Sequence, residues 1–221
     1  MTPDPYPHLY RSFRWQVPPA LNWFELCCAR WARSTPQATA VIEQGAQGAV
    51  RRHSYAALHD AALRAAAALA ALGVVRGERV AIVLPQRFET AVAQMAVSAL
   101  GAVAMPLSQL FGPEALQYRL ADSAARVAIV DDSAIDALLS VTAQCPALEH
   151  VVAVGAAQGR GSVDWDAALR APHPAINPVV TLAGDAAVLI YTSGTTGPPK
   201  GALMPQRALL GNLTGDRKSV V

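Results

Sequence analysis

The chain has 221 residues, of which 52% are hydrophobic and 15% are charged. At roughly 100–200 residues per domain this length predicts one α/β-sized domain or slightly more, and the high apolar content excludes an intrinsically disordered chain. The 18 basic and 16 acidic residues leave a net charge of +2 with no basic run. We therefore expect neither a nucleic-acid partner nor an anionic membrane partner.

The cysteine pattern and the first residues favour a reducing compartment. Cys27, Cys28 and Cys145 form no C-x-x-C pair and show no framework spacing, so we expect neither a disulfide scaffold nor a metal site. Residues 1–8 have no basic region followed by an apolar region, which argues against a secretory signal. The expected location is the cytoplasm.

In chain order, the first predicted segment is an extended arm over residues 1–19, because Pro3, Pro5 and Pro7 disfavour regular structure there. An amphipathic helix is predicted over 21–31 and a short strand over 40–42. The clearest helix follows, with Ser54 as its N-cap, a regular apolar stripe from Tyr55 to Leu72, and Gly73 as its stop.

Apolar strands then alternate with helical segments. No charge occurs between Glu89 and Glu114, a stretch long enough to span a bilayer. It is rich in alanine and is divided by Gly101, so a buried helix and a strand are predicted instead of a membrane span. The predicted strands are 79–84, 102–105, 126–130, 150–154 and 186–191, and the predicted helices are 88–100, 114–120 and one capped by Ser133. This order predicts an α/β fold with a mostly parallel layered sheet and flanking helices.

The segment from Tyr191 to Gly201 carries the candidate chemistry. The buried strand ends at Tyr191 and continues as T-S-G-T-T-G-P-P-K-G. Glycines allow the backbone to approach a ligand closely, and short hydroxyl side chains with backbone N–H groups can cradle an oxyanion. The segment also follows a strand, where open α/β sheets bind ligands. The candidate polyphosphate-binding residues are Thr192, Ser193, Gly194, Thr195, Thr196, Gly197 and Lys200.

Lysine is rare in this chain, which has 16 arginines but only Lys200 and Lys218. In a chain whose basic residues are almost all arginine, a lysine suggests that the compact charge of an ammonium group is needed, as it is in many phosphate-binding sites. The segment is not a Walker A loop, because Pro199 precedes Lys200 and Gly201 follows it.

Tyr191-Thr-Ser-Gly-Thr-Thr-Gly-Pro-Pro-Lys-Gly201 resembles the phosphate-loop signature of the adenylate-forming (AMP-binding) superfamily. That superfamily comprises acyl-CoA synthetases, adenylation domains of nonribosomal peptide synthetases, and luciferases. His53-Ser-Tyr-Ala-Ala-Leu58 is similar to its "T-Y-x-x-L" segment, and Leu100-Gly-Ala-Val-Ala-Met-Pro-Leu107 resembles its "G-A-x-x-x-P-L" turn and favours the acyl-CoA synthetases.

The resemblance implies that residues 20–215 are the amino-terminal part of the adenylate-forming fold. It also implies a two-step ligation, in which a small-molecule carboxylic acid reacts with ATP and Mg²⁺ to give an acyl-adenylate, and coenzyme A then displaces AMP. The resemblance specifies neither a particular acid nor an oligomeric state.

The chain also departs from the family pattern. Gln206 stands where family members often carry histidine. The adenine motif, the ribose motif and the carboxyl-terminal domain with its catalytic lysine are missing, so no catalytic residue is assigned and the chain alone is expected to be inactive. Residues 216–221 match the translation of GATCGGAAGAGCGTCGTG, a common sequencing-adapter string, and are expected to be a non-native tail. A genuine short gene is the alternative.

Three functions stay open on the sequence. The first is an ATP-dependent acid–CoA ligase represented by its amino-terminal portion. The second is an adenylation domain that loads a carrier protein, and the third is a non-catalytic nucleotide-binding module.

Overall fold

The computed structural model describes residues 6–45, 48–192 and 197–211. Its centre is a seven-stranded sheet with the strand order β7-β6-β5-β3-β4-β8-β9. The strands are β3 (Arg79–Val83), β4 (Val103–Pro106), β5 (Val127–Val130), β6 (His150–Ala153), β7 (Val163–Asp164), β8 (Ala186–Thr192) and β9 (Lys200–Pro205). All neighbouring pairs from β7 to β8 are parallel, and only β8 and β9 pair antiparallel. The predicted α/β fold with a mostly parallel sheet is confirmed.

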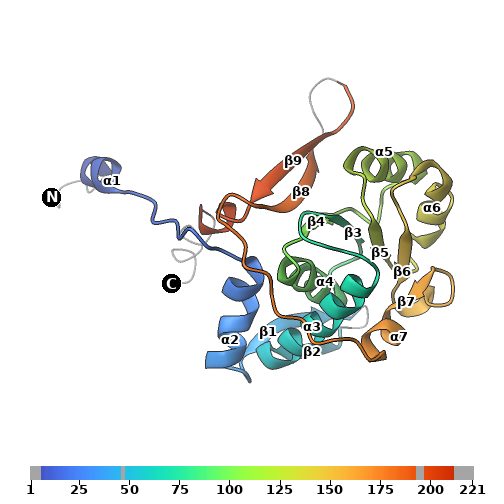
Figure 1. Ribbon diagram of the computed structural model, residues 1–221, viewed down its shortest axis with the longest axis horizontal. Coiled ribbons are helices and arrows are strands. Elements are labelled where there is room, and N and C mark those ends of the chain that lie inside the picture. Colours follow the sequence, from blue (N-terminus) through green and yellow to red (C-terminus); the bar gives the residue numbers. More distant parts are fainter. Residues whose placement is uncertain (1–5, 46–47, 193–196, 212–221) are drawn as a thin grey trace.

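Helices lie on both sides of the sheet (Figure 1). The longer ones are α3 (Tyr55–Ala71), α4 (Phe88–Ala99) and α5 (Pro113–Ser123). The shorter elements are α6 (Ile135–Leu139), α7 (Trp165–Arg170) and the single turns η2 (Thr142–Gln144) and η3 (Gly155–Ala157). Along β3, Val80 and Ile82 pack with residues of α3 and α4, whereas Ala81 and Val83 pack with residues of α5 and α6. Because side chains alternate along a strand, a strand covered on both faces needs a continuous apolar run.

The helix α3 forms as the sequence predicts. The Ser54 hydroxyl accepts a hydrogen bond from the Ala57 amide at 3.2 Å, which satisfies one of the free donors at the helix start. Gly73, just after the helix end, has φ +82°, a left-handed conformation that suits glycine. A two-stranded antiparallel sheet of β1 (Thr39–Gln44) and β2 (Val50–Ser54) leads directly into this helix.

The uncharged stretch between Glu89 and Glu114 is divided as predicted, with α4 ending at Ala99 and β4 beginning at Val103. Within the described residues, no helix is long and apolar enough to cross a membrane.

Three local features differ from the predictions. Residues 6–12 form helix α1 (Tyr6–Ser12) where an extended arm was predicted; Pro7 lies in its first turn, where a missing N–H costs nothing. The amino-terminal arm carries α1 away from the sheet (Figure 1). The helix predicted over 21–31 contains a π-helical turn, η1 (Glu25–Ala29), and continues as α2 (Arg30–Ser34).

The predicted cap Ser133 is the third difference. Helix α6 begins after Ala134 without a side-chain cap. The Ser133 hydroxyl instead donates to Asp131 Oδ1 at 2.5 Å and to Gln109 Oε1 at 3.1 Å. The Ile135 amide donates to the Asp131 backbone carbonyl at 3.1 Å. Asp131, and not Ser133, therefore accepts the hydrogen bond from the first residue of α6.

Candidate functional site

The motif segment joins the two strands of the β8–β9 hairpin. Thr192 is the last residue of β8, Lys200 is the first residue of β9, and the two face each other in the antiparallel register. Both are exposed. The motif therefore begins and ends at one point of the sheet edge, with a hydroxyl and an ammonium on adjacent strands.

Of the predicted site residues, the structure brings Thr192, Gly197 and Lys200 to this hairpin. Gly197 has φ +87°, a left-handed conformation that glycine adopts without strain. No heavy atom of the described residues lies within 4 Å of the place where a Cβ would stand, so the backbone conformation is what favours glycine there. Ser193, Gly194, Thr195 and Thr196 lie outside the described residues.

Lys200 keeps its charge available. Among the described residues it forms no ion pair with a carboxylate. An exposed ammonium of this kind fits an anionic ligand such as the phosphates of ATP, for which lysine acts as a point charge. Sequence analysis found this lysine but missed strand β9, which starts with it.

Tyr191, the residue before Thr192, connects strand β8 of the hairpin to helix α5. Its hydroxyl donates a hydrogen bond to Asp122 Oδ2 of α5 at 2.6 Å. Burial raises the pKa of Tyr191, and the hydrogen bond to the Asp122 carboxylate raises it further. The phenol is therefore a neutral donor across the physiological pH range. Sequence analysis did not find α5 as part of this region, because the two residues are 69 positions apart.

Gln206, which replaces the expected histidine, is fully buried. Its Oε1 accepts a hydrogen bond from the Trp23 amide at 3.1 Å, and the Trp23 indole Nε1 donates to the Gln206 carbonyl at 2.8 Å. Gln206 therefore ties the end of β9 to the segment before η1. Its side chain is not available to an exposed ligand.

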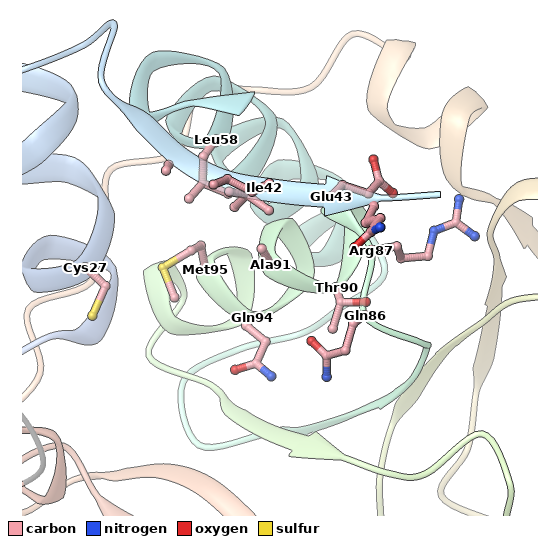
Figure 2. Close-up of a pocket in the computed structure, with 13 residues that line it drawn as sticks. Cys27, Ile42, Glu43, Leu58, Gln86, Arg87, Thr90, Ala91, Gln94 and Met95 are labelled. Atoms are coloured by element: carbon pink, nitrogen blue, oxygen red, sulfur yellow. The ribbon is translucent and has the colours of Figure 1, made fainter. Parts of the chain in front are cut away.

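A pocket of about 550 Å³ lies elsewhere, between β1 and α4. In Figure 2, Ile42 and Met95 lie toward one end of this pocket, and Glu43 and Arg87 lie toward the other. None of the residues that the structure describes in the β8–β9 hairpin lines it. Its size suits a small ligand, but it is not part of the predicted phosphate site.

The charged groups of this pocket are paired within the protein. Glu43 Oε2 lies 3.3 Å from His53 Nε2, and Arg87 forms hydrogen bonds to Glu89 at 2.7 and 3.1 Å. Burial raises the pKa of the Cys27 thiol, although Arg30 opposes the effect, so this thiol is protonated near neutral pH. The pocket accordingly offers packing and amide groups more than free charge.

The sequence pattern of the AMP-binding enzyme family matches residues 28–220. The chain therefore belongs to the AMP-binding enzyme family. Among its relatives, the acetyl-coenzyme A synthetase of Syntrophobacter fumaroxidans is 31% identical over 207 residues, which cover 86% of this chain and 32% of that enzyme. The acetyl-coenzyme A synthetase of Escherichia coli K12 is 32% identical over 215 residues, covering 87% of this chain and 32% of that enzyme.

Solved structures agree with this family. An acyl-CoA synthetase of Brucella canis superimposes with a TM-score of 0.80 at 25% identity, covering 93% of this chain and 39% of that one. The anthranilate CoA ligase AuaEII, solved in complex with anthranoyl-AMP, gives a TM-score of 0.75 at 26% identity, covering 86% of this chain and 36% of that one. The chain thus spans about a third of the length of the curated relatives it matches, 32% in each case above.

Proposed function

We propose that this chain forms the polyphosphate-binding part of an ATP-dependent acid–CoA ligase. The observation that carries the proposal is the cross-strand pair of Thr192 and Lys200, which sets an exposed ammonium, with no carboxylate partner among the described residues, beside a hydroxyl at the two ends of the motif. Membership of the AMP-binding enzyme family supports ATP as the nucleotide.

In this proposal the motif binds the β- and γ-phosphates of ATP. The residues assigned to this role are Thr192, Ser193, Gly194, Thr195, Thr196, Gly197 and Lys200. Backbone N–H groups and hydroxyls donate to the phosphate oxygens, and the Lys200 ammonium stabilises the charge that grows on the leaving pyrophosphate. Mg²⁺, which accompanies ATP, neutralises part of the same charge when it is bound.

The proposed reaction has two steps. A carboxylate oxygen attacks the α-phosphorus of ATP, the bond between the α-phosphorus and its bridging oxygen breaks, and pyrophosphate leaves. The thiol of coenzyme A then attacks the acyl carbon, and AMP leaves as the thioester forms. The acyl carbon of a carboxylate is a poor electrophile until it carries a good leaving group. The first step supplies AMP as that leaving group and must therefore precede the attack by the thiol. The names of the relatives support coenzyme A as the acceptor, and the cytoplasm is the proposed location because both cosubstrates are available there.

The direct test uses the 221-residue chain. Tripolyphosphate and Mg·ATP are titrated into the wild type and into Lys200→Ala by calorimetry. Losing one charge-assisted contact should weaken tripolyphosphate binding by about 10-fold or more. Arg64→Ala is the matched control, because Arg64 is also exposed and, within the described chain, also unpaired, and its removal changes the net charge equally. Equal affinity in the wild type and Lys200→Ala would contradict the proposal.

The proposed reaction is tested on the protein that the resequenced locus encodes. The expected result is exchange of pyrophosphate into ATP that depends on a carboxylic acid, followed by thioester formation with coenzyme A. Transfer only to a carrier protein would favour a carrier-loading adenylation domain. ATP binding with no exchange for any acid would favour a non-catalytic nucleotide-binding module.

A further inference from the structure

One face of helix α5 contacts the β8–β9 hairpin at both ends of the motif, at Tyr191 in β8 and at Pro199 just before β9. The Tyr118 hydroxyl donates a hydrogen bond to the Pro199 carbonyl at 3.0 Å, and the Asp122 carboxylate accepts one from the Tyr191 hydroxyl at 2.6 Å. Tyr118 and Asp122 are four residues apart, so they share one helix face. Pro199 directly precedes Lys200, and Tyr191 directly precedes Thr192.

Ring contacts reinforce these two hydrogen bonds. The Tyr118 and Tyr191 rings meet edge to face, with centroids 6.3 Å apart and planes at 80°. Arg119, the next residue after Tyr118, contacts two aromatic rings. Its Cζ lies 4.2 Å from the centroid of the Phe111 ring and 5.7 Å from that of the Tyr191 ring. The Arg119 side chain is only 8% exposed, so the contact surface on α5 is packed and not a loose surface contact.

The helix that carries these groups is itself fixed. Leu116 and Leu120 are fully or almost fully buried in the core on this side of the sheet, which also contains Leu189 of β8. Since α5 cannot shift without disturbing that core, it provides a rigid base for the half-buried Tyr118 hydroxyl and the exposed Asp122 carboxylate. Figure 1 shows α5 beside the hairpin.

The Pro199 carbonyl belongs to the peptide that links Pro199 to Lys200. A hydrogen bond on this carbonyl orients that peptide and therefore the direction in which the Lys200 side chain leaves the strand. The bond to Tyr191 fixes the opposite strand at the residue before Thr192. A binding loop whose ends are fixed in advance loses less conformational freedom when its ligand arrives.

We propose that Tyr118 and Asp122 are positioning residues that hold the two ends of the polyphosphate-binding motif in the geometry that binds phosphate. This inference rests on the proposed function, because it assigns a role at the same site. Neither residue touches the ligand; each acts through the hairpin strand that it contacts.

The test compares Tyr118→Phe, Asp122→Ala and Tyr191→Phe with Tyr55→Phe as the matched control. Tyr55 stacks on Trp31, and within the described residues its hydroxyl makes no hydrogen bond, so this control removes a hydroxyl without removing a contact. Asp122 is exposed on a helix, where alanine is well tolerated, so the three test variants are expected to fold.

The first measurement is hydrogen exchange in β8 and β9, with β3 and β5 as internal references. Loss of one hydrogen bond should speed opening of the hairpin by about fivefold and leave the reference strands unchanged. Equal acceleration in all four strands would indicate global destabilisation and would overturn the inference. Unchanged exchange in the hairpin would overturn it as well.

The second measurement is tripolyphosphate affinity, which a purely structural contact would not change. Each single variant should bind about fivefold more weakly, and Tyr55→Phe should bind like the wild type. Asp122→Ala combined with Tyr191→Phe should be no weaker than either alone, since both remove the same bond. Asp122→Ala combined with Tyr118→Phe should bind more weakly than either single variant, and by at most about 25-fold, the product for two independent bonds, because both residues also contact Tyr191.

The outcomes separate the two proposals. A wild-type chain that binds tripolyphosphate while the variants bind equally well overturns the positioning role alone. A wild-type chain that does not bind tripolyphosphate overturns the proposed function and the positioning role with it.

Discussion

The centre and the edge of the sheet differ in almost every property. All four residues of β5 are buried, and four of the five residues of β3 are buried. In β9, by contrast, the first four residues are exposed. The centre is apolar on both faces and is covered by helices, whereas the edge hairpin carries the hydroxyl and ammonium of the motif. The contrast predicts that stability depends on the central strands and that the proposed phosphate binding depends on the edge hairpin.

The largest expected effect is the loss of stability from a substitution in a central strand that leaves the edge hairpin unchanged. Ile129 of β5 is fully buried, so Ile129→Ala should lower the free energy of unfolding by about 2 to 5 kcal/mol, because it removes apolar contacts and leaves a cavity. Leu203→Ala in β9 is the control; Leu203 is 58% exposed, and the change should stay within about 0.5 kcal/mol. Urea unfolding measures both. Similar losses in the two variants would contradict the division between centre and edge.

A second comparison uses two glycines with the same conformation. Gly77 has φ +83° and Gly197 has φ +87°, and neither has a heavy atom near its missing Cβ. Alanine at either position is strained by about 1 to 2 kcal/mol. Gly77→Ala should therefore lower the free energy of unfolding and leave tripolyphosphate affinity unchanged, whereas Gly197→Ala should weaken tripolyphosphate binding. Calorimetry and urea unfolding on both variants distinguish strain from function, and weaker binding by Gly77→Ala would count against the distinction.

The smallest expected effect is a change of stability with pH, and it concerns Glu89 in helix α4, which packs on the central strands. Burial alone would raise the pKa of Glu89, but the hydrogen bond from Arg87, a backbone hydrogen bond and the nearby charges of Arg87 and His53 together outweigh burial and lower this pKa below its ordinary value of 4.5. A carboxyl whose folded-state pKa is lowered contributes stability above its unfolded pKa and loses it as the pH falls through the folded pKa. The wild type should therefore lose more stability below pH 4.5 than Glu89→Gln does. Parallel unfolding curves of the two proteins across that range would refute this.

Much of the fold follows from local sequence pattern. The buried strands β3, β5 and β8 are continuous apolar runs, and α3 has a cap, a stripe and a stop, so their positions could be predicted. Strand β9 was missed because Gly201 and Pro205 disfavour strand, and its exposed residues show no alternation of burial. Helix α1 was missed because the prolines before it resemble those of an extended arm.

The candidate site divides in the same way. Thr192, Gly197 and Lys200 could be found because the motif is contiguous. The contribution of α5 could not be found, since Tyr118 and Asp122 meet residues 81 and 69 positions away. Such contacts depend on the crossover that places α5 against β8, and no local pattern encodes them.

Because β9 is the last strand of the sheet, Lys200 has a second effect that does not involve phosphate. Within the described sheet, β9 has a neighbour on one side only, so its other side presents unpaired peptide groups to which a strand of another molecule could add. A lysine at the start of this strand and a proline at its end both oppose such addition, the first by charge and the second by its missing donor. Replacing Lys200 with an uncharged β-former would therefore favour self-association of the chain at high concentration.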